Sequence, residues 1–308
     1  MTSSNNSMNT SASLSTMKIS DWLRDSTQLL KNNGVNTARL DCLVLLGDAL
    51  GKDKGWLLAH PEEPVQGSTL YGLDEQLQRR AEHEPLAYIR EKSEFYGREF
   101  IVSNHTLEPR PETETMIDLL KQLTANDESL THPQKTGNTK LVTENEDLQI
   151  LDIGTGSGCL AITAKLEWPM AQVSGVDIDS DCIRVAIQNA EAYKAEVDFL
   201  KGNLLAPLLS ANFQLPTSII LANLPYVPDA HTINKAAMHE PSHALFGGED
   251  GLDYYRKLFS QMNSMKHAPL YVLTESLPFQ HKALIAIASE RKYTLEASDD
   301  FIQAFSRA

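Results

Sequence analysis

Apolar residues recur at helical spacing through the first part of the chain. Between residues 17 and 33 they fall at largely helical offsets, and an Asn-Gly pair then ends the run. The same spacing predicts further helices over 38–50, 56–60 and 70–82. Together these segments predict a small all-helical domain over residues 17–86.

The pattern changes after this domain. Short apolar stretches at 87–89, 95–97 and 100–102 are joined through polar residues, which is typical of extended chain. They predict a hairpin linker over residues 87–106. Helical spacing then returns at 113–123.

From residue 148 onward, apolar runs alternate with segments of helical spacing. The apolar runs predict strands over 148–153, 173–178, 197–200, 218–222 and 270–273, and helices fit between several of them, notably over 160–168 and 182–193. Parallel strands need crossover connections, and helices then cover both faces of the sheet. The alternation therefore predicts an α/β domain over residues 107–308, with a Rossmann-like, doubly wound, mostly parallel sheet.

Two segments are polar and aperiodic. Residues 1–16 are almost all Ser, Thr, Asn and Met, and bury too little apolar surface to offset the entropy of ordering, so we expect a disordered tail. Residues 124–147 predict a loop inserted at the surface. The chain contains neither the pattern of a secretory signal nor the ~18 apolar residues of a membrane span. We therefore expect a cytoplasmic protein without membrane contact.

Acidic residues outnumber basic ones by 41 to 27, which gives a formal net charge of −14. A chain this negative is a poor general binder of phosphate backbones, so we expect a protein or small-molecule partner and no direct nucleic-acid binding. Cys42, Cys159 and Cys182 stand too far apart for a disulfide framework and form no C-x-x-C pair. We expect buried thiols in a reducing compartment, and no metal site.

A glycine-rich turn follows the first predicted strand of the α/β domain. It comprises Gly154, Thr155, Gly156, Ser157 and Gly158, directly before a predicted helix. Glycines there let the backbone turn tightly and approach a bound cofactor, although the G-x-G-x-G spacing differs from that of dinucleotide sites. Asp177, near the end of the next strand, can accept hydrogen bonds from both hydroxyls of a ribose. Together these features predict a nucleoside-containing cofactor.

A second polar turn, residues 223–226, follows the strand predicted at 218–222. Ligands in open parallel sheets bind beyond the carboxyl ends of the strands, where this turn should lie. Asn223 offers a side-chain carbonyl, Leu224 a backbone carbonyl, and Pro225 a fixed chain direction. Tyr226 offers a flat face for a planar group. Two acceptors over one aromatic face predict a clamp for a planar NH₂ group.

With this turn the chain resembles class I S-adenosylmethionine-dependent methyltransferases that act on amide or exocyclic nitrogen. Their usual tetrapeptide is Asn-Pro-Pro-Tyr, and Leu224 departs from it at the second position. Because that position acts through its backbone carbonyl, leucine is compatible with the reaction but makes the turn less rigid. The form Asn-Leu-Pro-Tyr also occurs in ribosomal RNA adenine dimethylases, so the tetrapeptide leaves the substrate open.

Residues 109–114 read Pro-Arg-Pro-Glu-Thr-Glu, which is ordinary chemistry for a helix start. As a string they also resemble the signature of the release factor glutamine methyltransferases, the HemK/PrmC family. Further similar segments follow the family's order at 38–41, 56–61, 84–88, 95–97, 240–245 and 247–252. Glu275 and Gln280 stand where the family often has Glu and Gln. The resemblance runs from about residue 17 to the end, outside 124–147.

The resemblance implies methyl transfer from S-adenosylmethionine to the glutamine nitrogen in the Gly-Gly-Gln loop of peptide-chain release factors. Asn223 and the Leu224 carbonyl would accept the two amide N–H groups, and Tyr226 would stack on the amide plane. The cofactor would bind at Gly154, Thr155, Gly156, Ser157, Gly158, Asp177, Asn203, Leu204 and Asn223. Asn203 stands where the family often has an acidic residue. The helical domain would dock the substrate, and we expect a monomer.

Three other functions remain open from the sequence. The same chemistry could act on a glutamine of a ribosomal protein, since that sister group shares the fold and the kind of tetrapeptide. An RNA adenine N6-methyltransferase would need a basic face, which the charge of the chain disfavours. The departures at Asn203 and Leu224 also leave room for a cofactor-binding protein without catalytic activity.

Overall fold

The computed structural model describes residues 16–126, 148–210 and 217–307. The predicted disordered tail and inserted loop lie outside these ranges, except for Thr16 and residues 124–126, which end a helix. The chain divides into two compact units, 1–90 and 91–308, which are described separately.

The first unit is built from helices, as predicted, and from one short ladder. Its elements are β1 (Met17–Lys18), α1 (Ile19–Asn32), α2 (Ala38–Leu50), α3 (Lys54–Ala59), β2 (Pro64–Val65), α4 (Gly67–Ala81) and α5 (Leu86–Arg90). The first helix begins two residues later than predicted because Met17 and Lys18 pair with β2 in antiparallel register. The helical N-terminal region is confirmed.

Apolar side chains from all the helices of this unit gather in one cluster. Trp22 and Leu30 of α1, Leu45 of α2 and Leu73 of α4 are almost completely buried there. Fully burying side chains of this size stabilises the fold by roughly 1.5–3 kcal/mol each. The unit therefore has a core of its own.

Residues 87–89 are helical, whereas the sequence predicted extended chain. The N–H groups of Tyr88 and Ile89 donate to the carbonyl of Pro85 and open the single turn of α5. All three side chains, Ala87, Tyr88 and Ile89, are buried. A short run of buried apolar residues looks the same in a helix and in a buried strand, so periodicity could not separate the two.

The second unit begins with the hairpin of β3 (Lys92–Phe95) and β4 (Arg98–Ile101). Tyr96 and Gly97, the two residues of its turn, both have positive φ, as the twist of a tight hairpin requires. Asn189 of α9 (Ser180–Tyr193) fixes the end of the hairpin, because its side-chain amide bonds both backbone groups of Ile101.

A seven-stranded sheet forms the centre of this unit, in the order β10-β11-β9-β8-β5-β6-β7. The strands are β5 (Leu148–Ile153), β6 (Gln172–Asp177), β7 (Val197–Lys201), β8 (Thr217–Ala222), β9 (Tyr271–Glu275), β10 (Tyr293–Asp299) and β11 (Ile302–Arg307). The five from β9 to β7 are parallel, and β11 and β10 add an antiparallel edge. The predicted α/β class and mostly parallel, doubly wound sheet are confirmed.

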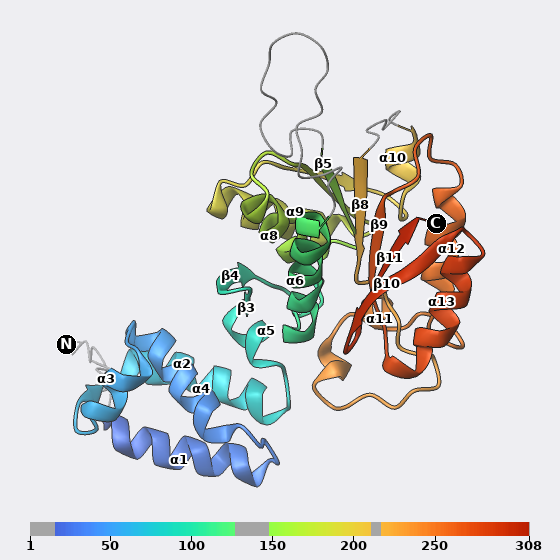
Figure 1. The fold of residues 1–308 in the computed structure, drawn as a ribbon. Coiled ribbons are helices and arrows are strands. Elements are labelled where there is room, and N and C mark those ends of the chain that lie inside the picture. Colours follow the sequence, from blue (N-terminus) through green and yellow to red (C-terminus); the bar gives the residue numbers. More distant parts are fainter. Residues whose placement is uncertain (1–15, 127–147, 211–216, 308) are drawn as a thin grey trace, which may run out of the picture. The chain divides into compact units, whose positions relative to one another are not determined.

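Helices cover both faces of the sheet (Figure 1). They are α6 (Pro111–Asn126), α8 (Cys159–Glu167) and α9 on one face, and α10 (Ala206–Ser210), α12 (Asp253–Met262) and α13 (His281–Ser289) on the other. Shorter turns, η1 (Ala237–His239), α11 (Ser242–Leu245) and η2 (Pro278–Gln280), lie in the connections. Among the described residues, no helix is long and apolar enough to cross a lipid bilayer.

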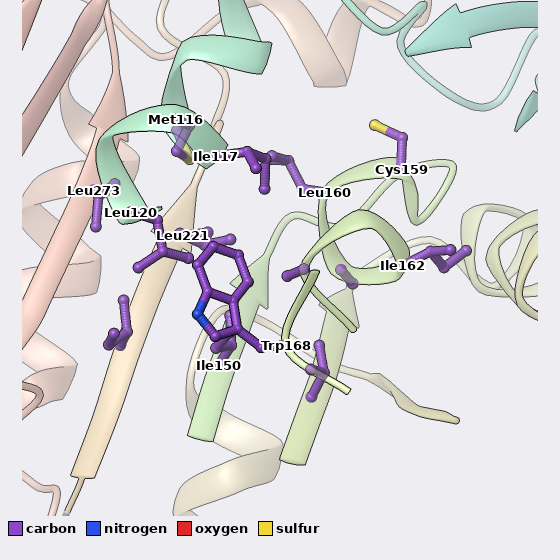
Figure 2. Packing of buried hydrophobic residues seen from close by; sticks show 14 of the residues in the cluster. Met116, Ile117, Leu120, Ile150, Cys159, Leu160, Ile162, Trp168, Leu221 and Leu273 are labelled. Carbon is purple, nitrogen blue, oxygen red and sulfur yellow. The ribbon is translucent and has the colours of Figure 1, made fainter. Parts of the chain in front are cut away.

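Alternate side chains of β5 enter different cores. Ile150 belongs to the cluster under α6 and α8, while Leu151 and Ile153 belong to the cluster under α12 and α13. Figure 2 shows the first cluster, where the indole of Trp168 lies beside Ile150 with Leu120 close by. Burial on both faces holds the central strands rigidly.

The central strand β5 lies between β6 and β8: the chain runs from β5 through β6 to β7 on one side and then crosses back to β8 on the other. Ligands in doubly wound sheets bind at the carboxyl ends of strands where the order reverses in this way. The two polar turns identified from the sequence follow β5 and β8, and therefore meet at this edge.

Candidate active site

A cavity of about 280 Å³ opens at the carboxyl ends of β5, β6 and β8. Among its lining residues are Gly154, Thr155, Gly156, Ser157, Asp177, Asn203, Leu204, Asn223, Leu224 and Pro225. The structure thus brings both predicted turns and the predicted ribose carboxylate to one cavity. Of the predicted site residues, Gly158 and Tyr226 do not line it.

Two glycines of the turn have different physical roles. Gly156 has φ +53°, and a Cβ built there would meet no atom within 4 Å, so the missing side chain leaves space open. Gly158 has φ +79°, and its Cβ would come within 3.0 Å of the Cβ of Ala186. Gly156 therefore suits a close-lying ligand, whereas Gly158 allows α8 to pack against α9.

Asp177 lies at the end of β6 with its carboxylate already fixed. One oxygen accepts from the N–H of Gly156 and the other from the N–H of Asp179, both at 2.9 Å. Burial raises the pKa of Asp177, and these two hydrogen bonds oppose the rise. Each carboxylate oxygen can accept a further hydrogen bond, so the group can still bind a diol.

Asp152, at the end of β5, is a buried carboxyl group that the sequence analysis assigned no role. It accepts from the Thr155 hydroxyl at 2.6 Å and from the N–H of Ala161 at 3.2 Å. Burial raises its pKa to about 7. Through these two hydrogen bonds it links Thr155 of the glycine-rich turn to Ala161 of α8.

The remaining walls of the cavity are largely apolar. Leu107, Leu160, Val176 and Ile178 contribute side chains, and Tyr254 adds an aromatic ring. An apolar slot with a carboxylate at one side suits a planar base joined to a ribose. The residues present therefore fit a nucleoside-containing group.

The second turn places its first two residues in the cavity wall. The side-chain N–H₂ of Asn223 donates to the hydroxyl of Thr113 at 3.1 Å. The N–H of Leu224 donates to the hydroxyl of Tyr255 at 3.3 Å, and its side chain is buried in the core under α12. Leucine at this position therefore packs in the core while the residue also contributes to the cavity wall.

Tyr226 is half-buried and points its hydroxyl toward the sheet. The hydroxyl donates to one carboxylate oxygen of Glu275 at 2.9 Å. Thr113 donates to the other oxygen at 2.6 Å. Burial raises the pKa of Glu275, and the two donated hydrogen bonds oppose the rise. One carboxylate at the end of β9 thus connects to both ends of the second turn.

Other segments singled out from the sequence support the same turn. Gln280 donates to the backbone carbonyls of Tyr226 and Asp250, at 2.8 and 2.7 Å. Arg110 forms a 2.5 Å ion pair with Glu240. The Gln280 contact holds the second turn, and the Arg110–Glu240 pair joins residues 130 positions apart in the sequence.

Sequence reasoning missed the roles of several supporting residues. Thr113 occurs within the string 109–114, but nothing in that string indicates a contact with Asn223. Glu275 was noted only because it stands where the resembled family often has Glu. Tyr255, whose hydroxyl bonds the backbone of Ala222, Leu224 and Glu275, carried no signal.

Three partly buried groups in the described ranges lie close enough to bind a cation: His105, Asp179 and Asp181. Asp179 already caps α9, and Asp181 pairs with Arg184. Apart from this spacing, no feature of the described residues points to a metal ion at these three groups.

The chain matches two family models. Residues 21–90 match the PrmC N-terminal domain, and residues 129–228 match the ribosomal protein L11 methyltransferase (PrmA). The first match falls in the helical unit, and the second covers the two polar turns.

Individual proteins extend the comparison. A release factor glutamine methyltransferase of Bacillus subtilis (strain 168) is 34% identical over 237 residues, which cover 76% of this chain and 76% of that protein. A bifunctional methyltransferase of Rickettsia bellii (strain RML369-C) is 35% identical over 256 residues, 77% of this chain and 44% of that protein. The chain spans about half the length of the Rickettsia relatives. A solved ribosomal protein L11 methylase of Lactobacillus delbrueckii subsp. bulgaricus is similar over 67% of this chain and 83% of that chain, with TM-score 0.42 and 15% identity.

Proposed function

Because the chain belongs to the release factor glutamine methyltransferase family, we propose that it methylates the side-chain nitrogen of a glutamine in a peptide-chain release factor. The methyl donor is S-adenosylmethionine. The modified residue is the glutamine of the Gly-Gly-Gln loop.

The observation that carries the proposal is the shared cavity of the two polar turns. Gly156 leaves space for a close-lying cofactor, and Asp177 offers acceptors for its ribose. Asn223 and Leu224 border the same cavity, so an amide held by them lies next to the cofactor. Asn203 and Leu204 complete the wall on the base side of this arrangement.

The reaction is demanding because the lone pair of an amide nitrogen is delocalised into its carbonyl. S-adenosylmethionine, when bound, supplies an electrophilic methyl group on a sulfonium sulfur. Transfer would form the N–C bond, break the C–S bond and leave S-adenosylhomocysteine, and the nitrogen, on which positive charge develops, would lose one proton to solvent. The Oδ1 atom of Asn223 and the carbonyl of Leu224 accept the two substrate N–H bonds, and these interactions strengthen as that charge develops.

Orientation is the main contribution of the protein. Well-oriented reactants gain on the order of 7–11 kcal/mol over the same groups free in solution. In the proposed site, Tyr226 stacks on the amide plane while its hydroxyl stays bound to Glu275. Pro225 fixes the direction of the chain between the two.

The helical unit docks the release factor in this proposal. It has its own core and matches the PrmC N-terminal domain over residues 21–90. In the Gly-Gly-Gln loop of the release factor, the two glycines have no side chains to obstruct the glutamine. This lets the loop enter a small cavity.

A ribosomal protein is the second candidate substrate, because residues 129–228 match the L11 methyltransferase model. That match covers part of the α/β unit and none of the helical unit. The N-terminal match therefore favours the release factor.

The proposal is tested by incubating the protein with isotopically labelled S-adenosylmethionine and candidate release factors. Mass spectrometry should find one added methyl group on the Gly-Gly-Gln peptide. A release factor with Gln replaced by Ala in that loop is the matched control. Ribosomal protein and RNA are offered in parallel incubations. Label on either of them instead of the release factor, or no label on any of the three, would contradict the proposal.

A further inference from the structure

We infer that Glu275 and Thr113 are positioning residues that determine which end of the Asn223 side-chain amide faces the substrate. The inference rests on the proposed function for the identity of the substrate. It concerns a chain of hydrogen bonds that runs from the sheet to the cavity.

The first step is the occupancy of the Glu275 carboxylate. The hydroxyl of Thr113 lies 2.6 Å from one oxygen, and the hydroxyl of Tyr226 lies 2.9 Å from the other. Glu275 and Thr113 are 1% and 2% exposed, so water cannot readily replace either partner. The arrangement joins α6, β9 and the second turn through one buried group.

The second step follows from the chemistry of these groups. In the structure both hydroxyls donate to Glu275, one to each carboxylate oxygen, which is the arrangement of a group that only accepts hydrogen bonds. Thr113 has a single hydroxyl proton, and that proton is used in the contact with Glu275. Toward Asn223, at 3.1 Å, Thr113 can therefore act only as an acceptor.

The third step fixes the amide. Only the NH₂ end of Asn223 can donate to Thr113, so the oxygen Oδ1 is the end left for a ligand. An oxygen accepts the N–H of a substrate amide, whereas an NH₂ group there would oppose it. The buried carboxylate thus selects the acceptor end of Asn223 over the donor end, which has nearly the same shape.

The same carboxylate also holds the aromatic side of the site. Its second oxygen fixes the Tyr226 hydroxyl, and with it the ring proposed to stack on the substrate. Burial raises the pKa of Glu275, with a smaller contribution from Glu112, while the hydrogen bonds from Thr113 and Tyr226 and the charge of Arg110 oppose the rise. A neutral amide at 275 keeps only one acceptor oxygen, so it would release one of the two hydroxyls.

A pair of substitutions at Thr113 tests the inference by steady-state methylation of a release factor. Thr113→Val keeps the shape and removes the acceptor, so we expect kcat to fall about 100-fold, as when one oriented polar group is removed from an active site. KM for the release factor and Kd for S-adenosylhomocysteine should stay within about threefold of the parent values. Thr113→Ser retains the hydroxyl and should restore most of the lost transfer.

A parallel substitution tests Glu275. In Glu275→Gln an NH₂ group, which donates but does not accept, replaces one carboxylate oxygen, so one of the two hydroxyls can no longer donate to this side chain. We expect a similar fall in kcat with cofactor affinity retained. A Glu275→Gln or Thr113→Val protein with parental kcat would overturn the inference, as would a Thr113→Ser protein as impaired as Thr113→Val.

An NMR measurement decides the question without any substrate. In the parent protein bound to S-adenosylhomocysteine, the Asn223 side-chain NH₂ protons should show nuclear Overhauser contacts to the methyl group of Thr113. Asn223→Asp lacks the NH₂ group and identifies the signal. Absence of these contacts in the parent protein would refute the inference. If the parent protein transfers no methyl group to any release factor, the proposed function fails, and the NMR result still stands for the amide orientation.

Discussion

Asp177 is proposed to bind the cofactor ribose while its carboxylate already accepts two backbone N–H groups. Asp177→Ala should weaken S-adenosylhomocysteine binding at least about tenfold, because hydrogen bonds to a charged group contribute roughly 1.5–3 kcal/mol each. Isothermal titration calorimetry measures the change. Asp181→Ala is the matched control, since Asp181 is a nearby carboxylate that does not line the cavity. Equal affinity in the two variants would contradict the ribose assignment.

Asp152 makes a different prediction, on stability. Burial raises its folded-state pKa from 3.8 to about 7, so the folded state holds the proton more tightly than the unfolded chain. Stability is therefore lost as the pH rises from about 4 to about 7, by up to about 1.4 kcal/mol per pH unit. The Asp152→Asn side chain cannot ionise. As the pH rises from 5 to 7, the free energy of unfolding of this variant should therefore increase by about 2–3 kcal/mol relative to that of the parent protein.

Urea denaturation of both proteins at several pH values measures this difference. Other titrating groups cancel because they are common to the two proteins. Parallel stability curves across this range would show that Asp152 does not titrate as described.

At the residue scale, the sequence predicted the groups that line the cavity better than those that orient them. Glycines and acidic residues directly after strands are visible as local patterns. The contact between Thr113 and Glu275 joins positions 162 apart and leaves no trace in spacing. Tyr226 was predicted as an aromatic face, but its hydroxyl contact could not be read from the sequence.

At the scale of elements, the predictable parts are those with a buried pattern. The parallel strands β5, β6, β8 and β9 are largely buried on both faces and therefore read as mostly apolar runs, whereas the edge strand β7 is only partly buried. The strand β10 was not predicted because its residues after Tyr293 are mostly exposed at the edge of the sheet. The turn α5 was wrongly predicted as extended chain. Its apolar residues are consecutive and buried, a pattern that a short helix shares with a buried strand.

The packing of α8 against α9 predicts an asymmetry between glycines. Gly158→Ala places a Cβ 3.0 Å from that of Ala186, at a φ that costs an L-residue roughly 1–2 kcal/mol. With overpacking of roughly 1–3 kcal/mol, the variant should lose about 2–5 kcal/mol of stability. Gly72→Ala in α4 meets no atom within 4 Å, and should gain up to about 1 kcal/mol. Chemical denaturation compares the two, and an equal effect would contradict the packing role of Gly158.

At the scale of the whole molecule, the two units have separate cores. The cluster of the helical unit ends at Ile89, and the clusters of the second unit begin at Phe95. The sequence predicted a helical region followed by an α/β region because the period of the apolar residues changes between them. It could not predict the division at Arg90, because α5 was read as part of the linker.

Deleting residues 1–90 tests the proposed docking role of the helical unit separately from cofactor binding. The remaining unit should unfold cooperatively and bind S-adenosylhomocysteine within about twofold of the parent affinity, since the cavity lies wholly within it. Methylation of an intact release factor should fall at least about tenfold in kcat/KM, which corresponds to docking contacts worth about 1.4 kcal/mol or more. Parental kcat/KM in the truncated protein would contradict a docking role for the helical unit.

The central claim is that Asn223 holds a glutamine amide beside the bound cofactor. It is tested most directly by measuring methyl transfer to a release factor and cofactor affinity on the same preparation of Asn223→Ala. We predict that transfer falls at least about 100-fold while the affinity for S-adenosylhomocysteine changes no more than about threefold. Transfer at the parental rate would contradict the claim.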